Sequence, residues 1–432
     1  MRPRYPLILV LAFVFPIFLS AQAVDRTLSS MAGGVAGGLA GLVVSLPAGC
    51  GSVFQDRQCR LSTMVKGFAL GNVLGSTIGA IRGGAFSACS RSERFGRALA
   101  GTLAGAGLGT AAVSTTHGFV RIGLSPVVQL AEGIGAAAML HHCDRGALAE
   151  PDSAALSFGQ QCHAPDRALA RDAAALGLTG GYAGLYIYFK HAWWSGERAP
   201  HWFVENDWDQ NERDIDKFGH FFGGYQLTRL TSELLRAGCM PPTRAALLAA
   251  LYAYSFQFQI EEWDGTQKIY GFSPADLIAD AGGAIFAVAQ QRTTWLQATK
   301  PVWSYRPTLA YRRRNEPGRV GIGQPRATTD YSGQTYWFST DVNALLPDNV
   351  KRFWPAILRV SPGYSITDYV NPDTGAPQRA RRKILLSIDI DPEHLPGDGK
   401  AWRTIKHELS FFRIPGPTLQ LTPSSKFFAA YY

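Results

Sequence analysis

Short motifs that mark common enzyme and metal sites are missing from this 432-residue sequence. It has no H-E-x-x-H metalloprotease motif, no G-x-S-x-G nucleophile elbow, no Walker loop and no dinucleotide fingerprint. The Glu-x-x-His pairs of di-iron bundles are absent, and so is any C-x-x-C pair of a zinc ribbon or thioredoxin-like site. The sequence therefore offers no catalytic or metal motif of high specificity.

Charged residues are few, at 17%, while hydrophobic residues make up 46% of the chain. The mean hydropathy of −0.03 argues against a protein that is fully embedded in a membrane. The length leaves room for two or three domains with real cores. The formal net charge is +9, which favours contact with an acidic partner.

The first residues are typical of a secretory signal peptide. Arg2 and Arg4 precede the apolar run "PLILVLAFVFPIFLS", and "AQA" follows as an A-x-A cleavage site. We therefore predict a signal peptide over residues 1–23 and an exported chain, with an uncleaved anchor as the alternative. In an exported chain the basic charge meets anionic membrane lipid or lipopolysaccharide, and no nucleic acid.

The cysteine count is even, which favours disulfides in an oxidising compartment. The six cysteines are Cys50, Cys59, Cys89, Cys143, Cys162 and Cys239. Pairing within local segments predicts Cys50 with Cys59 and Cys143 with Cys162, and unpaired buried thiols are the alternative. The "LPAGC" segment that ends at Cys50 lies too far into the chain for a lipidation site, and Pro47 stands where an aliphatic residue is expected.

Residues 24–148 are rich in glycine and alanine. Glycine recurs at every fourth position in three runs: Gly33/Gly37/Gly41, Gly67/Gly71/Gly75/Gly79/Gly83 and Gly101/Gly105/Gly109. This spacing places the glycines on one face of a helix, where two backbones can approach closely. We expect glycine-zipper helical hairpins that insert into a membrane or form homo-oligomers there. A glycine-rich soluble bundle is the alternative, because the apolar runs are marginal in length for spanning a bilayer.

Residues 149–298 have the clearest helical pattern. Four helices are expected, over "ARDAAALGLTGGYAGLYIYFKHAWW", from near Asp214, over "TRAALLAALYAYSFQFQIEEW" and over "SPADLIADAGGAIFAVAQQ". The last has a strong start signal, with Ser273 as N-cap, Pro274 at the first helical position and Asp276 three residues after the cap. Short connections between the helices predict a four-helix bundle.

Residues 299–432 have a different texture, with many prolines and arginines and with period-two alternation. "GQTYWFSTDV", "PAILRVSPGYSI" and "KILLSIDID" are predicted strands of a small antiparallel sheet. In the third strand Ile384, Leu386, Ile388 and Ile390 share one face, opposite Leu385, Ser387, Asp389 and Asp391. The sheet either packs on the bundle or lies on the outer membrane. The predicted fold class is mainly α with a β-rich C-terminal part.

Acidic residues recur at helical spacing on three of the predicted helices. The second helix carries Asp216 and His220 four residues apart, beside Lys217. The third carries Gln257, Glu261 and Asp264 along one stripe, and the fourth carries Asp276 and Asp280. If the three stripes face one another, they form one polar site, and buried charges of this kind need a partner or a metal.

This constellation has three interpretations. Asp216, His220 and Glu261 could bind a divalent cation, or Asp216 could orient His220 as a general base with Glu261 or Asp264 as the acid. Lys217, Gln257, Asp276 and Asp280 are further candidate binding residues. In the third interpretation the cations and acids form a purely structural network. For single residues, Asp276 could only cap its helix, Asp264 could end one before Gly265, and Lys217 could reach solvent.

The same residues carry a family resemblance. "DKFGH" from Asp216, "EEWDG" from Glu261 and "GFSPAD" from Gly271 resemble the YfiM-like predicted periplasmic lipoproteins, a bacterial domain of unknown function. The match covers roughly residues 180–290, and the layout is faintly similar to VanZ-like membrane proteins. Asp280 stands where the family usually has asparagine, and the lipidation cysteine is missing. The resemblance implies an envelope location and no particular reaction.

The combined prediction is a membrane-associated envelope protein in the periplasm, at the outer membrane or alternatively at the inner one. Its polar cluster is expected to bind a cation or a lipid or glycan headgroup, or to serve a structural role. The alternative is an enzyme, a metal-assisted or acid/base hydrolase or transferase that acts on an envelope lipid or glycan. The missing nucleophile and metal motifs favour the binding role.

Overall fold

The computed structural model describes residues 21–50, 61–82, 89–113, 126–144, 165–205, 207–313 and 327–432. The chain divides into two compact units, each of which is described by itself. The helical unit comprises Met1–Asn206 and Gln226–Val288, and the sheet unit comprises Asp207–Tyr225 and Ala289–Tyr432. Most of the predicted signal peptide lies outside the described residues.

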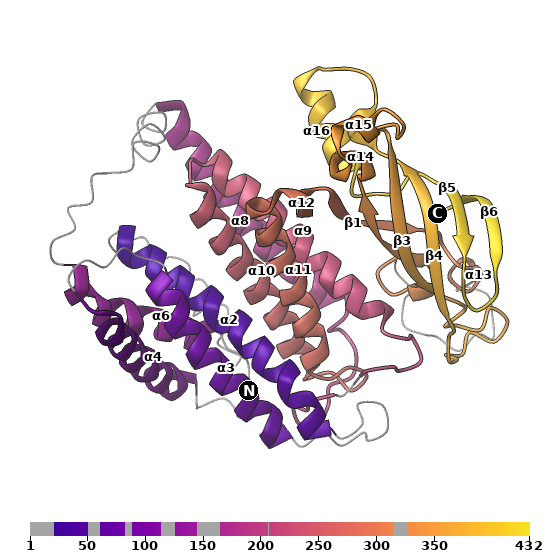
Figure 1. Ribbon diagram of the computed structural model, residues 1–432. Coiled ribbons are helices and arrows are strands. Elements are labelled where there is room, and N and C mark those ends of the chain that lie inside the picture. Colours follow the sequence, from indigo (N-terminus) through magenta and orange to yellow (C-terminus); the bar gives the residue numbers. More distant parts are fainter. Residues whose placement is uncertain are drawn as a thin grey trace. The chain divides into compact units, whose positions relative to one another are not determined.

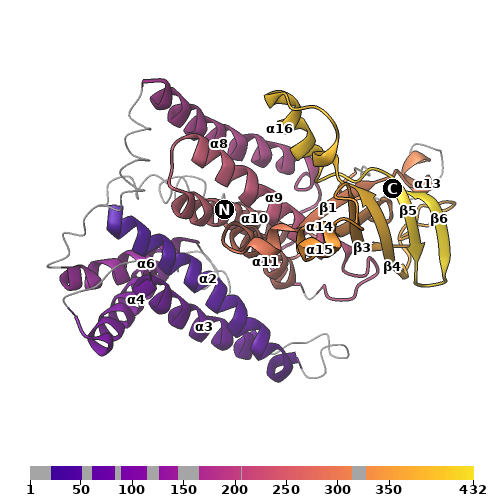
Figure 2. The same cartoon turned by 45° about the horizontal axis from the view of Figure 1, so that its top comes forward.

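The helical unit begins with four helices from the glycine-rich part of the sequence (Figure 1). They are α2 (Ala21–Cys50), α3 (Leu61–Arg82), α4 (Arg91–Val113) and α6 (Pro126–Leu140), followed by the short η3 (His141–Asp144). In both ribbon views α2 lies alongside α3 and α4 lies alongside α6 (Figure 2). Within the described residues no helix combines the length and the apolar character that a membrane span requires.

Glycine allows these helix pairs to touch through their backbones. A Cβ atom built on Gly37 of α2 would lie 2.2 Å from the carbonyl oxygen of Gly71 on α3, where no side chain fits. A Cβ atom on Gly101 of α4 would lie 2.3 Å from the carbonyl oxygen of Gly135 on α6. The glycines spaced by four residues therefore lie where helices of one chain contact each other closely.

Four further helices follow, each where the sequence pattern predicts one. They are α8 (Pro165–Ala192), α9 (Ile215–Ala237), α10 (Pro242–Asp264) and α11 (Pro274–Arg292). The division between the units falls inside α9, between Tyr225 and Gln226. In the helical unit, rings and aliphatic side chains of α8, α9 and α10 pack around Trp194, Phe256 and Ile260 in one cluster.

The sheet unit contains one antiparallel sheet of six strands, in which each strand pairs with its neighbour in sequence. The strands are β1 (Thr299–Tyr305), β2 (Gln334–Thr340), β3 (Leu358–Ile366), β4 (Arg382–Ile390), β5 (Gly416–Gln420) and β6 (Lys426–Tyr431). The short helices are α12 (Thr294–Gln297), α13 (Leu309–Arg312), η4 (Tyr331–Gly333), α14 (Val342–Leu345), α15 (Asp348–Lys351), η5 (Pro392–His394) and α16 (Lys400–Leu409). The β-rich C-terminal prediction is confirmed.

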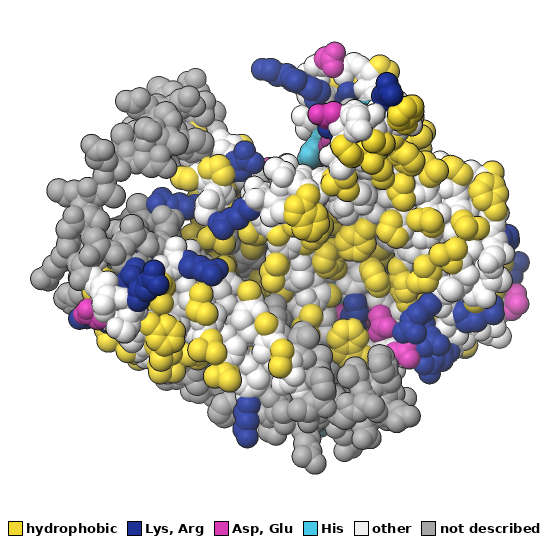
Figure 3. All heavy atoms as spheres, viewed as in Figure 1, with side chains coloured by type: hydrophobic (Ala, Val, Ile, Leu, Met, Phe, Trp, Pro, Cys, Tyr) yellow, Lys and Arg dark blue, Asp and Glu magenta, His cyan; other side chains and the backbone are white. Residues whose placement is uncertain are grey.

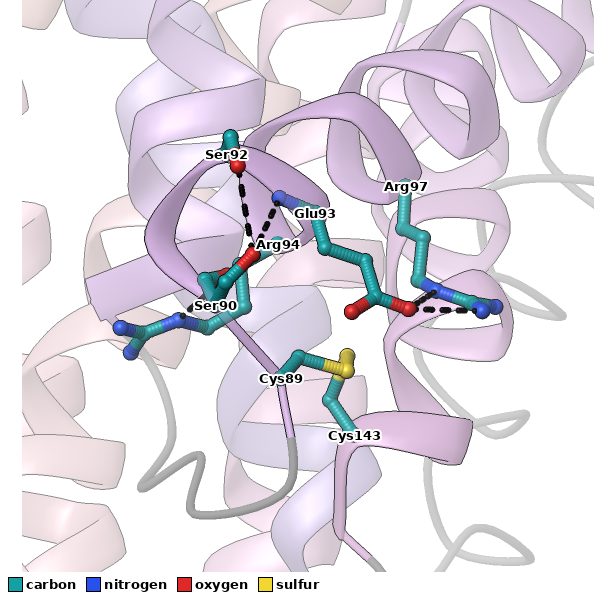
Figure 4. Close-up of a disulfide and its surroundings, with 7 residues drawn as sticks. All are labelled: Cys89, Ser90, Ser92, Glu93, Arg94, Arg97 and Cys143. Atoms are coloured by element: carbon teal, nitrogen blue, oxygen red, sulfur yellow. Dashed lines mark hydrogen bonds and ion pairs between the residues drawn. A yellow bond between two sulfur atoms is a disulfide. The ribbon is translucent and has the colours of Figure 1, made fainter.

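One cysteine prediction is wrong. Cys143 is bonded to Cys89 and not to Cys162 (Figure 4). Cys89 lies just before α4 and Cys143 lies in η3, directly after α6, so the packing of α4 on α6 brings the Cα atoms of the two cysteines to 5.2 Å. Helix pairing therefore selects the partner over nearness in sequence. Cys239 is disulfide-bonded as well. The predicted Cys50–Cys59 pair lies outside the residues whose side chains are described.

Candidate functional site

Two buried carboxylates meet between α10 and α11. Glu261 and Asp280 are each only 1% exposed, and carboxylate oxygens of the two residues lie within 4.8 Å of each other. Their positions follow from helical spacing, since Glu261 lies one turn before the end of α10 and Asp280 lies in the second turn of α11. Two of the predicted acidic stripes are thus brought together inside one unit.

Both carboxylates are held in place by donors. The backbone N–H of Ser273 donates to Oε2 of Glu261 at 2.9 Å. The side-chain amide of Gln257, one turn before Glu261, donates to Oδ1 of Asp280 at 2.5 Å. Glu261 therefore accepts from the N-cap residue of α11, where the helix dipole favours a negative charge. Gln257, predicted as a binding residue, positions Asp280.

Asp276 lies in the first turn of α11 and Asp264 in the last turn of α10, and a purely structural role for their carboxylates stays a prediction. The backbone N–H of Asp276 donates to Oγ of Ser273 at 3.0 Å, which is the predicted N-cap of α11. Asp264 is the last residue of α10, and its Oδ1 accepts a hydrogen bond of 2.6 Å from the indole Nε1 of Trp194. These contacts fix the ends of two helices.

In the sheet unit, Lys217 is buried between two acids. Its side chain is 7% exposed, and its Nζ forms ion pairs with Asp207 and, at 2.8 Å, with Asp216. The interpretation in which Lys217 reaches solvent is therefore wrong, because two carboxylates compensate the ammonium group inside the protein. Asp207 comes from the segment before α9, which the helix-based prediction did not include.

Negative charge gathers around this lysine. The pKa of Glu212 is raised to about 7, because burial and, after it, the charges of Asp216 and Asp207 outweigh the lowering effect of Lys217. Carboxylate oxygens of Asp207 and Asp216 lie within 4.8 Å of each other. The first turn of α9 and the segment before it thus carry more acid than one lysine neutralises.

His220 lies one turn after Asp216 on α9 and is half-buried. Asp216, Lys217 and His220 belong to the sheet unit, whereas Glu261 and Asp280 belong to the helical unit. The predicted convergence of all three stripes therefore stays a prediction.

One buried acid went unnoticed in the sequence. Glu132 of α6 is 1% exposed and accepts hydrogen bonds of 2.7 and 2.9 Å from the amide of Asn72 and of 2.9 Å from the hydroxyl of Ser76, both on α3. Burial raises its pKa to about 7, although both hydrogen bonds lower it. Its one signal in sequence is that it is the single charged residue of α6, "PVVQLAEGIGAAAML".

Comparisons with known proteins address only the middle of the chain. No curated protein and no solved structure shows significant similarity to it. The faint similarity to VanZ-like membrane proteins stays a prediction. Residues 201–292, which include α9, α10 and α11, match the model of the family described as predicted periplasmic lipoprotein (DUF2279), in agreement with the motifs read from the sequence.

Proposed function

We propose that this protein is a binding module of the cell envelope, in which the Glu261–Asp280 pair holds a hard divalent cation such as Ca²⁺ or Mg²⁺. The observation that carries the proposal is the placement of two carboxylates, each 1% exposed, within 4.8 Å of each other on adjacent helices. Like charges at this separation disfavour double ionisation in a protein interior. A divalent cation removes that repulsion and takes oxygen ligands of this type.

The same pair of acids bears on the choice of ligand. A phosphate or carboxylate headgroup that entered alone would meet two groups of its own charge. A headgroup is therefore expected to bind through the cation, which would bridge protein and lipid. Asp216 and His220 remain proposed additional ligands from the sequence pattern.

The envelope location rests on the family match, since that family is described as periplasmic. Association with the outer membrane and self-association through the glycine-rich helices are further parts of the proposal. Because Gly37 and Gly71 already contact each other within one chain, self-association would use other faces of α2 and α3.

Elemental analysis of purified protein tests the cation. After dialysis against Ca²⁺, Mg²⁺ and Mn²⁺ and gel filtration, we expect stoichiometric metal in the native chain and its loss in Glu261→Gln and Asp280→Asn. Glu197→Gln is the matched control, because Glu197 is an exposed carboxylate of the same unit, paired with Lys268. The same measurement on Asp216→Asn and His220→Ala tests whether these residues are also ligands.

Two results would contradict the proposal. One is a native chain without metal after dialysis, and the other is full metal content in both Glu261→Gln and Asp280→Asn. Thermal unfolding with and without EDTA separates a lost ligand from a lost fold, because a cation that binds only the folded state raises the melting temperature.

A further inference from the structure

The sheet presents apolar side chains to the outside. In the unbroken pairing of β3 with β4, Ile384, Leu386, Ile388 and Ile390 lie on the same face, and each is between 38% and 43% exposed. The pairing with β5 and β6 extends this face, because Leu386 lies opposite Leu419 and Leu419 opposite Phe427. The outer face is defined here as Ile384, Leu386, Ile388, Ile390, Leu419, Leu421 and Phe427.

The opposite face of the same strands is polar and buried. Its residues include Ser304, Thr335, Ser339, Arg359, Ser361, Ser365, Ser387, Asp389, Thr418 and Gln420, all less than 9% exposed. Arg413 enters this interior with a side chain that is 0% exposed, pairs with Asp389 at 3.2 Å and lies over the ring of Trp337 at 3.6 Å. Arg359 pairs with Asp391 at 2.6 Å.

The sheet curls around its polar face. Rings of Trp337 on β2 and Tyr431 on β6 lie 6.0 Å apart, although β3, β4 and β5 separate these strands in the sheet. Val302 and Leu385 complete the cluster from β1 and β4. The polar residues are therefore inside the curve, and the outer face is its convex side.

Part of the convex side is covered by α9. Within the sheet unit, the ring of Phe218 stacks on Tyr364 at 4.5 Å, and Phe221 contacts Phe338 at 5.6 Å. These contacts cover the β2–β3 side of the sheet, and the β4–β6 side stays exposed. Figure 3 shows hydrophobic side chains gathered over these exposed strands.

Helix α16 has the same inverted pattern. Trp402, Ile405 and Leu409 share one helix face and are 37%, 48% and 44% exposed. Lys406 is 6% exposed and its Nζ donates to the carbonyl oxygens of Leu395 and Gly397. A helix folded for water alone would expose the lysine and bury the other three residues.

This arrangement reverses the rule for antiparallel sheets with one solvated face, which place apolar side chains inward and polar ones outward. Contiguous exposed apolar surface of this kind marks an interaction site on soluble proteins. Charge indicates the partner. The sheet unit, Asp207–Tyr225 with Ala289–Tyr432, holds 22 lysines and arginines against 16 acids, a surplus of six positive charges.

Basic residues lie next to the exposed strands. Arg382 begins β4 on the side of the outer face and is exposed. Lys400 and Arg403 are exposed on α16. Arg382 pairs with Asp209 and Asp214, so Lys400 and Arg403 are the cations that we expect to meet a partner.

We propose that the outer face, together with the exposed stripe of α16, docks on an anionic lipid surface. Apolar side chains would enter the interface between headgroups and acyl chains, and the surrounding cations would contact lipid phosphates. A second copy of the chain fits less well, because two such faces in contact would bring two basic rims together. This proposal stands on a different surface from the cation site, so the two can fail separately.

Vesicle flotation of the full chain tests the proposal. We expect binding to vesicles of phosphatidylethanolamine with phosphatidylglycerol, and weaker binding to phosphatidylcholine vesicles or at high salt. The double variant Leu386→Asp/Ile388→Asp should lower the partition constant at least about tenfold, because two buried aliphatic side chains are lost from the interface. Lys400→Gln/Arg403→Gln should lower binding to the anionic vesicles only.

Ile269→Asp is the matched control, since Ile269 is 73% exposed and belongs to the helical unit. All variants should keep the native melting temperature, because the substituted side chains are exposed. Equal flotation of native chain and Leu386→Asp/Ile388→Asp overturns the proposal. So does a native dimer in sedimentation that this variant dissociates, which would assign the face to a second copy.

Discussion

Both the glycine-rich helices and the C-terminal sheet bury carboxylates, but they surround them differently. Glu132 between α3 and α6 accepts hydrogen bonds from an amide and a hydroxyl, which are neutral donors. Asp389 inside the sheet faces the guanidinium of Arg413 at 3.2 Å and accepts a hydrogen bond from Ser339. These donors to Glu132 carry no charge, whereas Asp389 faces a cation.

The neutral donors affect the protonation of Glu132. They only partly offset the loss of water, so the pKa of Glu132 rises to about 7. In the sheet, removing one partner of the buried ion pair would leave an uncompensated charge, so the interior depends on Arg413 and Asp389 together. Burial alone therefore does not tell whether an acid is charged; the nearest donors decide it.

The largest effect is expected from breaking the sheet interior. Arg413→Ala removes the cation from Asp389 and Trp337, and we expect a loss of about 3–5 kcal/mol in the free energy of unfolding. Arg381→Ala, on the exposed start of β4, should change it by less than about 0.5 kcal/mol. Chemical denaturation, followed by a spectroscopic signal from the sheet unit, measures the free energy of unfolding of both variants.

A double substitution sharpens the test. Arg413→Met/Asp389→Leu removes both charges and should recover most of the lost stability, since apolar replacements of buried pairs are often neutral. An equally large loss in the single and double variants would show that the ion pair is not the cause.

The next effect is a pH dependence that comes from Glu132. Its pKa is about 7 in the folded chain against an ordinary value of 4.5, so between these pH values only the folded state holds the proton. Stability therefore falls as the pH rises from 4.5 to 7, by up to roughly 3 kcal/mol. Glu132→Gln should flatten this slope, most visibly as higher stability at pH 8.

Glu212, with a pKa of about 7, adds a slope of the same sign in the sheet unit, so the difference between native chain and Glu132→Gln is the quantity to compare. If the melting temperatures of the native chain and Glu132→Gln changed in parallel from pH 5 to 8, the assignment to Glu132 would be wrong.

A smaller effect tests the backbone contacts of the glycine-rich helices. A Cβ atom on Gly71 would lie 2.0 Å from the carbonyl oxygen of Gly37, so Gly71→Ala should push α2 and α3 apart and cost about 1–3 kcal/mol. Gly107 of α4 has nothing within 4 Å of such an atom, so Gly107→Ala should stabilise the chain by about 0.5–1 kcal/mol. Thermal melts of both variants check the opposite signs.

The last effect is confined to acid pH and is therefore the smallest between pH 5 and 8; it concerns Glu393, which has the reverse pH dependence. Burial raises its pKa, but the hydrogen bond from His407 and the charge of Lys300 outweigh it and hold the value at about 2. Its contribution to stability is present above the ordinary value of 4.5 and is lost as the pH falls towards 2. Acid titration of Glu393→Gln should show a shallower loss than the native chain below pH 4.5.

Local signals in the sequence predicted much of the fold. Ser273 caps α11 as its spacing to Asp276 indicated, because a helix start depends on residues within one turn. Period-two alternation placed β4 correctly, but periodicity cannot tell which of two faces is buried. The inward position of Asp389 follows from Arg413 and Ser339, which lie on other segments.

The candidate site was predictable to a similar extent. Helical spacing grouped Glu261 with Gln257 on one predicted helix and Asp280 with Asp276 on the next. Glu261, Gln257 and Asp280 meet between α10 and α11. Asp207, one of the two ion-pair partners of Lys217, was not predicted because it comes from a segment without periodicity. Cys143 is bonded to Cys89, which is 54 residues away in sequence, and pairing rules based on nearness in sequence cannot predict such a bond.

The register of β4 makes the orientation of its side chains depend on the number of residues that precede the strand. Nine consecutive residues of β4 pair with β3 without a bulge. Inserting one residue ahead of Ile384 would exchange the two faces, so that isoleucines point inward while Ser387 and Asp389 point to water. The strand would then have the usual pattern of an antiparallel sheet, with apolar side chains inside and polar side chains in water. Whether the apolar side chains of β4 point outward or inward therefore depends on the parity of residue positions, and the insertion of a single residue would change it.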